Sequence, residues 1–293
     1  MRFTEIGQQL RAYRLESGLR AEEIAARLGV SRAALYRYEK GEVIKLDTIK
    51  RLAELLKISP LSLLGIGVEY YNRPAGYFER VRQMEETAEQ ILQVHGAICY
   101  LTTSDAYDAA LADAFEEAHE NTPDRAAQRA LADQVLGILA ARKRLYNVRR
   151  PGIIAMISTF AIQRFVETGL AGALPLTERL RRMCRDVALA EVENIANLME
   201  AEPMGLQFGL LAPAAEPGGA FVVLRARDRA SLAINPFSTD LPPNAQSGVA
   251  MITGADEAMA AHQRAAETNW REAVKGAAAA GRVRELLAAA RRD

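Results

Sequence analysis

The sequence predicts a small all-helical domain followed by a larger α/β domain whose sheet is covered by helices. Short amphipathic segments separated by turn residues fill residues 1–65, and strand-like apolar runs cluster between residues 205 and 253. Long helical patterns surround those runs. We therefore divide the 293 residues into a first domain at 1–68, a linker and connecting helix at 69–95, and a second domain at 96–293.

Charge is distributed unevenly between these parts. The chain has 37 basic and 37 acidic residues, with 49% apolar and 25% charged residues, as in ordinary globular proteins. Residues 1–65 nevertheless carry a net charge of +4, which leaves −4 on the remainder. A basic domain on a mildly acidic body is typical of a protein that meets a polyanion through one domain only.

Three features favour a cytoplasmic protein that has no membrane partner. The longest weakly polar run, Gly152–Ile162, is far shorter than the ~20 residues of a membrane helix. The N-terminus lacks the continuous apolar core of a signal peptide. The two cysteines, Cys99 and Cys184, are too few for a disulfide framework, which favours a reducing compartment and a role in the core.

The first domain is predicted to contain five short helices. Gly29 favours a tight turn after the second helix, Ser31 is a good N-cap for the third, and Gly41 stops it. Pro60 suits the first turn of the fifth helix. We expect helices at residues 3–16, 21–28, 32–40 and 47–56, with the last beginning at Ser59-Pro60.

Arg20–Gly41 consists of two of these helices joined by a short turn, which is the helix-turn-helix arrangement whose second helix enters the DNA major groove. On that helix Leu35 and Tyr38 face the domain, and the opposite outward stripe is basic and aromatic. Arginine presents a planar fork to guanine, and lysine anchors phosphates. The candidate DNA contacts are Arg20, Ser31, Arg32, Ala33, Tyr36, Arg37, Lys40 and Lys45.

Residues 6–65 resemble the Cro/C1-type (XRE) helix-turn-helix family, most specifically through GVSRAALYRYEKG at Gly29–Gly41. The resemblance implies a lambda-repressor-like fold of five helices and a DNA-binding transcriptional regulator. It also implies a structural ion pair between Arg14 and Glu39. The family often places a Gln at the start of its second helix, where this chain has Ala21, so Arg20 is expected to substitute.

Between the domains, Tyr70–Gly76 has the Pro and Gly content of a linker, and a helix is expected over Tyr77–His95. Its apolar residues follow the spacing of a coiled-coil seam over fewer than three heptads. The helix then either pairs with a second copy or packs on its own C-terminal domain. The seam residues are Tyr77, Val81, Met84, Ala88, Ile91 and His95.

The second domain begins with a predicted strand at Ala97–Thr103. Helices are expected at about 107–121, from 122 to about 146, at about 176–200 and at 256–290, and strands at 205–211, 220–226, 231–237 and 248–253. The helix at 176–200 has a broad apolar face that is either core or a docking surface. That face contains Leu180, Met183, Val187, Val192, Ile195 and Leu198.

No catalytic or metal-binding motif is found in the second domain. His95, His119 and His262 are scattered, so we expect no metal, no cofactor and no enzymatic activity. Ala220–Phe237 together with Thr268–Ala273 loosely resembles the phospholipase D-like sensor domains of some bacterial regulators. Because the His-x-Lys pair of that enzyme family is absent, the resemblance implies a binding pocket without catalysis.

Three functions are compatible with these patterns. The favoured one is a homodimeric transcriptional regulator that binds a palindromic operator on double-stranded DNA and is controlled by a small-molecule effector. The others are an enzyme with a DNA-binding domain, and an antitoxin-like protein or adaptor whose C-terminal domain binds a protein partner. The sequence assigns no effector-binding residues, although Arg225, Arg227 and Arg229 lie where an anion could bind.

Overall fold

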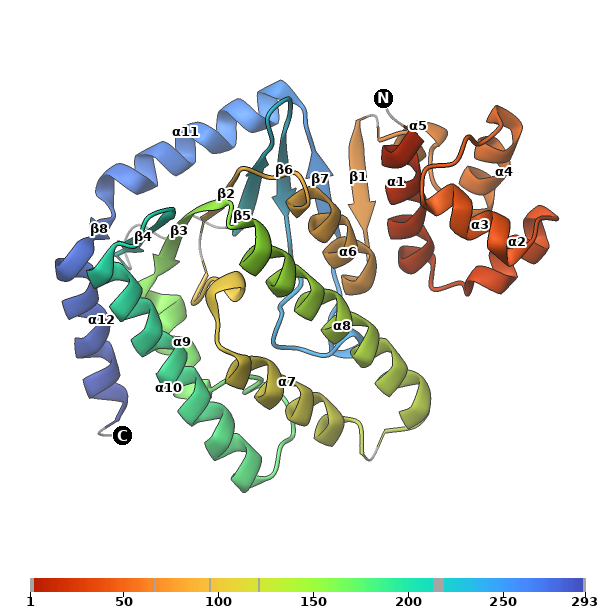
Figure 1. The fold of residues 1–293 in the computed structure, drawn as a ribbon. Helices are drawn as coiled ribbons and strands as arrows, with labels where there is room; N and C mark the ends of the chain where they lie inside the picture. Colours follow the sequence, from red (N-terminus) through yellow and green to blue (C-terminus); the bar gives the residue numbers. More distant parts are fainter. Residues whose placement is uncertain (1–2, 66, 95, 121, 213–218, 292–293) are drawn as a thin grey trace.

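The structure, a computed structural model, describes residues 3–65, 67–94, 96–120, 122–212 and 219–291 (Figure 1). A group of short helices lies at one side of a larger domain that is built on a sheet (Figure 1). The coarse prediction of a helical N-terminal domain and a C-terminal domain with a mixed, helix-covered sheet is confirmed. The helices of the first domain are α1 (Phe3–Ser17), α2 (Ala21–Leu28), α3 (Arg32–Glu39), α4 (Leu46–Leu56) and α5 (Pro60–Leu63).

Local signals in the sequence set the bounds of these helices. Gly29 ends α2 in the left-handed conformation, with φ of 71°. The Ser31 hydroxyl accepts a hydrogen bond from the backbone of Ala34 and so caps α3. Leu35 and Leu52 are fully buried between the helices. The chain in this domain therefore folds as its caps and apolar spacing predict.

Eight strands form one mixed sheet within the described residues, in the order β1-β7-β6-β5-β2-β3-β4-β8. The strands β2, β3 and β4 run parallel, and the other neighbouring pairs are antiparallel. Their bounds are β1 (Val68–Tyr71), β2 (Gln90–Val94), β3 (Gly152–Ser158), β4 (Leu206–Leu211), β5 (Phe221–Arg225), β6 (Ala230–Ile234), β7 (Ala250–Thr253) and β8 (Val274–Lys275).

The two faces of the sheet are covered unequally. Along β2, Ile91 points to a large core with most of the helices, whereas Leu92 and Val94 point to a smaller core beneath α11 (Asp256–Glu272). The helices on the large-core side are α6 (Pro74–Glu85), α7 (Asp105–Ala118), α8 (Arg125–Arg149), α9 (Thr159–Thr168), α10 (Glu178–Ala201) and α12 (Gly276–Ala290). Side chains of the N-terminal domain belong to this same large core.

The predicted helix over Tyr77–His95 is wrong in its second half. The helix α6 ends at Glu85, and Gln90–Val94 forms β2, which lies between β3 and β5. His95 lies outside the described residues. The expected seam residues Tyr77, Val81, Met84, Ala88 and Ile91 are buried in the chain's own core. The helix therefore packs on its own domain, and the coiled-coil alternative has no exposed seam.

Three further predictions of secondary structure are corrected. The expected linker contains the edge strand β1, which pairs with β7. Ala97–Thr103 is not a strand but a loop with a 3₁₀ turn at Tyr100–Thr102, because β2 has ended just before it. The expected helix at 256–290 is interrupted by β8, which pairs with β4. The predicted helix end at Asn121 lies outside the described residues.

The apolar face of α10 is core rather than a docking surface, although it is shifted from the predicted one. Val192 and Ile195 are buried as expected, together with Cys184, but Met183 is exposed. Small residues such as Ala188 and Ala196 complete the buried face. The helix packs against α7, α9 and α12.

Candidate nucleic-acid interface

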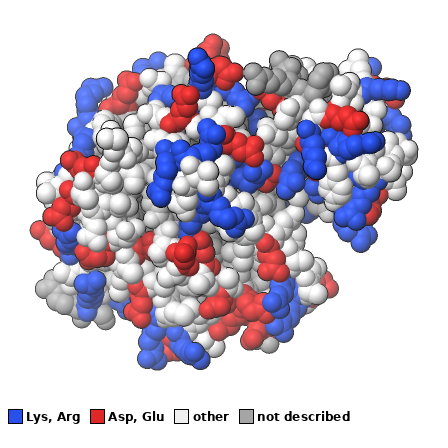
Figure 2. All heavy atoms as spheres, viewed as in Figure 1, with Lys and Arg blue, Asp and Glu red and all other residues white. Residues whose placement is uncertain are grey.

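The outward stripe of α3, formed by Arg32, Ala33, Tyr36, Arg37 and Lys40, faces solvent. All are exposed except Tyr36, which is half-buried. The helix lies on the side of α1 that is turned away from the sheet (Figure 1). Basic side chains project from this end of the molecule, with acidic ones between them (Figure 2).

The two arginines of the outward stripe form ion pairs with acidic neighbours. The Arg32 Nη1 atom lies 2.7 Å from Glu22 Oε1, and the Arg32 guanidinium lies 5.3 Å from the centre of the Tyr36 ring. The Arg37 Nε atom lies 3.0 Å from Glu42 Oε2. Solvent-exposed pairs of this kind contribute about 0–1 kcal/mol. Both guanidiniums can therefore leave their carboxylates for another anion at little cost.

The other candidate contacts surround the outward stripe. Arg20 precedes α2, where its backbone N–H and its guanidinium both donate to the Glu23 carboxylate. Lys45 precedes α4 and is exposed. Among the residues that the structure describes, Lys40 and Lys45 form no ion pair. Ala21 is buried at the start of α2 and has no polar side chain, so Arg20 is the residue that can make a polar contact at this end of the helix.

Arg14 and Glu39 join α1 to the end of α3, as the family resemblance implies. The Arg14 Nε atom lies 2.5 Å from Glu39 Oε1, and Nη2 lies 3.1 Å from Oε2. Burial alone would lower the pKa of Arg14, but the bonds from Glu39 outweigh it and hold that pKa above its usual value. A Cβ atom on Gly7 would lie 2.5 Å from the Tyr38 carbonyl oxygen, so the two helices touch directly there.

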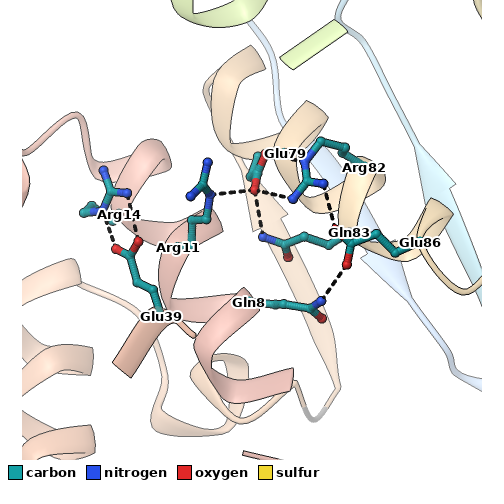
Figure 3. A network of polar contacts seen from close by, with 8 residues as sticks. All are labelled: Gln8, Arg11, Arg14, Glu39, Glu79, Arg82, Gln83 and Glu86. Atoms are coloured by element: carbon teal, nitrogen blue, oxygen red, sulfur yellow. Dashed lines mark hydrogen bonds and ion pairs between the residues drawn. The ribbon is translucent and has the colours of Figure 1, made fainter. Parts of the chain in front are cut away.

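The same helix α1 is bonded to α6, through contacts that we call the α1–α6 junction (Figure 3). The Arg11 Nε atom lies 2.7 Å from Glu79 Oε1, and the Gln8 amide donates to Glu86 at 3.1 Å. Arg82 lies between Glu79 and Glu86 and pairs with both. Sequence reasoning missed these residues, because charges at positions 79, 82 and 86 have the spacing of a solvated helix face.

A buried polar cluster secures the N-terminal domain to the edge of the sheet. The Glu69 carboxylate on β1 accepts hydrogen bonds from Gln9 at 2.6 Å, from the Tyr71 hydroxyl at 2.8 Å and twice from Arg80. Glu69 and Arg80 are both buried. At one end of α1, the Glu16 carboxylate accepts from the backbone of residues 72 and 73. These bonds fix the orientation of α1 on the second domain.

The remaining candidates of the second domain have structural contacts. His119 Nε2 lies 2.9 Å from the Asn244 amide oxygen, and His262 Nδ1 lies 2.9 Å from a backbone carbonyl of its own helix. Arg225 donates to two glutamines, and Arg229 pairs with Glu5 of α1. Burial raises the pKa of Cys99 to about 11.

Within the described residues there is neither a group of potential metal ligands nor a helix suited to a membrane. No three His, Cys, Asp or Glu side chains there lie close enough together to hold a metal ion. None of the described helices has the length and apolar character needed to cross a membrane.

Residues 5–63 match a protein family described as a helix-turn-helix domain. The chain is 36% identical over 104 residues to the HTH-type transcriptional repressor RghR of Bacillus subtilis (strain 168), an alignment that covers 35% of this chain and 67% of that protein. Among solved structures it is similar to TrmBL2, an archaeal chromatin protein, with 11% identity and a TM-score of 0.33. That similarity covers 78% of this chain and 63% of the other.

Proposed function

This chain belongs to the family of helix-turn-helix transcriptional regulators, and we propose that it is a sequence-specific member of the Cro/C1-type (XRE) group that reads double-stranded DNA with α3. The observation that carries the proposal is the exposed basic stripe of α3, held on α1 by the Arg14–Glu39 pair. A rigid helix with an exposed basic face satisfies the geometric need of the major groove.

Each side chain has a distinct proposed role. Arg32 and Arg37 leave their carboxylates and bond bidentately to guanine, a contact that contributes about 1–3 kcal/mol of base discrimination. Ala33 allows close approach of the helix to the bases. Arg20, Ser31, Lys40 and Lys45 bond phosphates, and Tyr36 supports Arg32 by its ring.

The proposal includes a homodimer on a palindromic operator, with half-sites about 34 Å apart, and an effector bound in the second domain. Light scattering at micromolar concentration tests the dimer. The proposal includes no catalytic step. The phospholipase D-like enzymes, which the second domain loosely resembles, need a His-x-Lys pair for catalysis, and this sequence lacks that pair. A turnover screen of the purified chain against metabolite pools tests that part.

The DNA-binding roles are tested on a duplex that the purified full-length chain selects from a random pool. Arg37→Ala and Arg32→Ala are expected to weaken binding to the selected duplex about 5- to 150-fold and to bind a scrambled duplex almost unchanged. Lys40→Ala is expected to weaken both duplexes equally and to lower the slope of log K against log salt by about 1.

Arg182→Ala is the matched control, because Arg182 also forms an exposed ion pair, with Glu178, but lies on α10. It is expected to leave both affinities unchanged. Equal losses on both duplexes for all three α3 variants would refute the assignment of roles. A chain that selects no duplex at low salt would refute DNA binding itself.

A further inference from the structure

A cavity of about 380 Å³ lies at one end of the sheet in the second domain. It is lined by the carboxyl end of β2, by Gly96 just beyond that strand, by the start of β5 and by the loop after β6. In mixed and parallel sheets, the crevice beyond the carboxyl ends of parallel strands is the usual place for a ligand. The volume is within the range of small-molecule pockets.

Several aromatic residues line this cavity. They come from α6, α7, α9 and the loop after β6, namely Tyr77, Phe78, Tyr107, Phe165 and Phe237. Phe221 at the start of β5 also borders the cavity, but its ring packs against His262 of α11. Protein interiors ordinarily fill such volumes with side chains, because an uncovered apolar wall loses its packing contacts. Exposed Ala220 and Pro236 also line it and mark a side that is open to solvent. A flat apolar molecule can therefore enter and cover these rings.

The charged groups at the cavity exclude an anion. Among the described residues that line it, Arg142 is the one cation, whereas Glu85 and Asp240 are both acidic. The Nε and Nη2 atoms of Arg142 are bonded to Glu85 at 2.8–3.2 Å, so this guanidinium is already neutralised. An incoming carboxylate or phosphate would meet an excess of negative charge and gain no free guanidinium in return.

One helix connects the cavity to the N-terminal domain. On α6, Tyr77, Phe78 and Glu85 line the cavity. Residues 79 and 82 of the same helix, with Glu86 directly after its end, form the α1–α6 junction with Gln8 and Arg11. The helix α1 in turn holds α3 through the Arg14–Glu39 pair. Because the junction bonds α1 to α6, a displacement of α6 carries α1 with it and thereby changes the placement of α3.

We propose that this cavity is the effector site of the regulator, that it takes a compact aromatic molecule with either no charge or one positive charge, and that α6 conveys its occupancy to α1. The inference rests on the proposed DNA-binding function for its regulatory meaning, but not for the binding of the ligand. The ligand can change the placement of α3 only to the extent that it binds one placement of α6 more tightly than another.

The ligand class is tested first, without DNA, with three probes that share one ring system. The fluorescence anisotropy of 1-naphthylmethylammonium, 1-naphthalenemethanol and 1-naphthoate is titrated with the full-length chain. The ammonium and the alcohol are expected to saturate, with naphthoate at least 10-fold weaker. Equal or tighter binding of naphthoate, or binding of no probe, would overturn the proposal.

Two variants locate the binding at the cavity. Ala220→Trp fills its open side and is expected to weaken the ammonium and the alcohol at least 10-fold, whereas Ala226→Trp, at the other end of β5 and outside the cavity, is expected to change neither. Asp240→Asn, a change in a loop, is expected to weaken the ammonium at least fivefold and leave the alcohol unchanged. Unaltered binding by Ala220→Trp would place the probes elsewhere and sink the assignment.

Regulation is tested last, on the selected duplex. Saturating 1-naphthylmethylammonium is expected to change the Kd of the wild-type chain for DNA at least fivefold, and to have no effect on Ala220→Trp. A probe that binds without changing the Kd would refute the effector role. A chain that binds the probe but no duplex would refute the proposed function instead, and the direct titration keeps the two failures apart.

Discussion

The surface of α3 and the α1–α6 junction use the same kinds of residue for opposite purposes. Both consist of arginines paired with glutamates, at similar distances of 2.7–3.0 Å. The side chain of Arg32 on α3 is 59% exposed and that of its partner Glu22 on α2 is 52% exposed. At the junction the side chain of Arg11 is 47% exposed, but that of Glu79 is only 1% exposed. Water can therefore replace either partner in the first region, whereas it does not reach the Glu79 carboxylate in the second.

This difference in burial decides what each ion pair can do. An exposed pair contributes little to stability, so its arginine can exchange a carboxylate for a phosphate or a base. Removing one partner of a buried pair is strongly destabilising, because the remaining charge is left without compensation in a medium of low polarity. We therefore read the α3 surface as exchangeable and the junction, with the Glu69 cluster beside it, as fixed.

The largest effect is expected from Glu69→Gln. The change leaves the buried Arg80 guanidinium without its counter-charge and is expected to lower the free energy of unfolding by about 3–5 kcal/mol. Glu22→Gln makes the same chemical change at an exposed pair and is expected to stay within about 0.5 kcal/mol. Denaturant titration of both variants measures the contrast. Similar losses of unfolding free energy in the two variants would contradict the distinction between the buried and the exposed region.

A smaller loss is expected from Gly76→Ala, at the contact of α6 with α1. The new Cβ would lie 2.9 Å from the Glu16 Cβ and 3.0 Å from its Cα, so the helices must separate, at about 1–3 kcal/mol. Gly137→Ala in α8 meets nothing within 4 Å and is expected to stabilise the chain by about 0.5–1 kcal/mol. Thermal unfolding measures both variants. A lower Tm for Gly76→Ala and a higher Tm for Gly137→Ala would support the comparison, and shifts in the same direction would contradict it.

The smallest effect is expected for the pH dependence of the free energy of unfolding. Burial would raise the pKa of Glu79, but hydrogen bonds from Arg82 and Gln83 and the charge of Arg11 outweigh it and leave that pKa below its usual value. A lowered pKa stabilises the folded chain above the ordinary glutamate range, and this contribution is lost as the pH falls through the folded pKa. Glu79→Gln is therefore expected to be less stable than the wild type at pH 7, with the gap narrowing below about pH 4.5. A gap that is independent of pH would show that the lost contribution is not one of charge.

The N-terminal domain was predictable because its signals are local. The Ser31 cap, the Gly29 turn and the apolar spacing around Leu35 and Leu52 all act within a few residues, and so does the exposure of the outward stripe. The Arg14–Glu39 pair followed from a family pattern and is present. The roles of the stripe residues at DNA, the domain boundaries and the oligomeric state stay predictions.

The second domain was predicted only in outline, since short segments of the connector are decided by distant partners. Gln90–Val94 continues a helical spacing from Tyr77, yet it is a strand because β3 and β5 lie on either side of it. Val68–Tyr71 reads as a linker, but β7 makes it a strand. The sequence pattern alone does not hold this pairing information, because the partner strands are 60 residues or more away in the chain.

The sequence by itself determined the helices of the N-terminal domain and the basic, exposed character of α3, since spacing, caps and charge are properties of neighbouring residues. Only the tertiary structure decided that Glu69 and Glu79 are buried, that α6 contacts both α1 and a cavity, and that aromatic residues far apart in the sequence line that cavity. The physical reason is that a carboxylate can be buried only where the fold brings a positively charged partner to it. For Glu79, one such partner is Arg11, which lies 68 positions earlier in the chain.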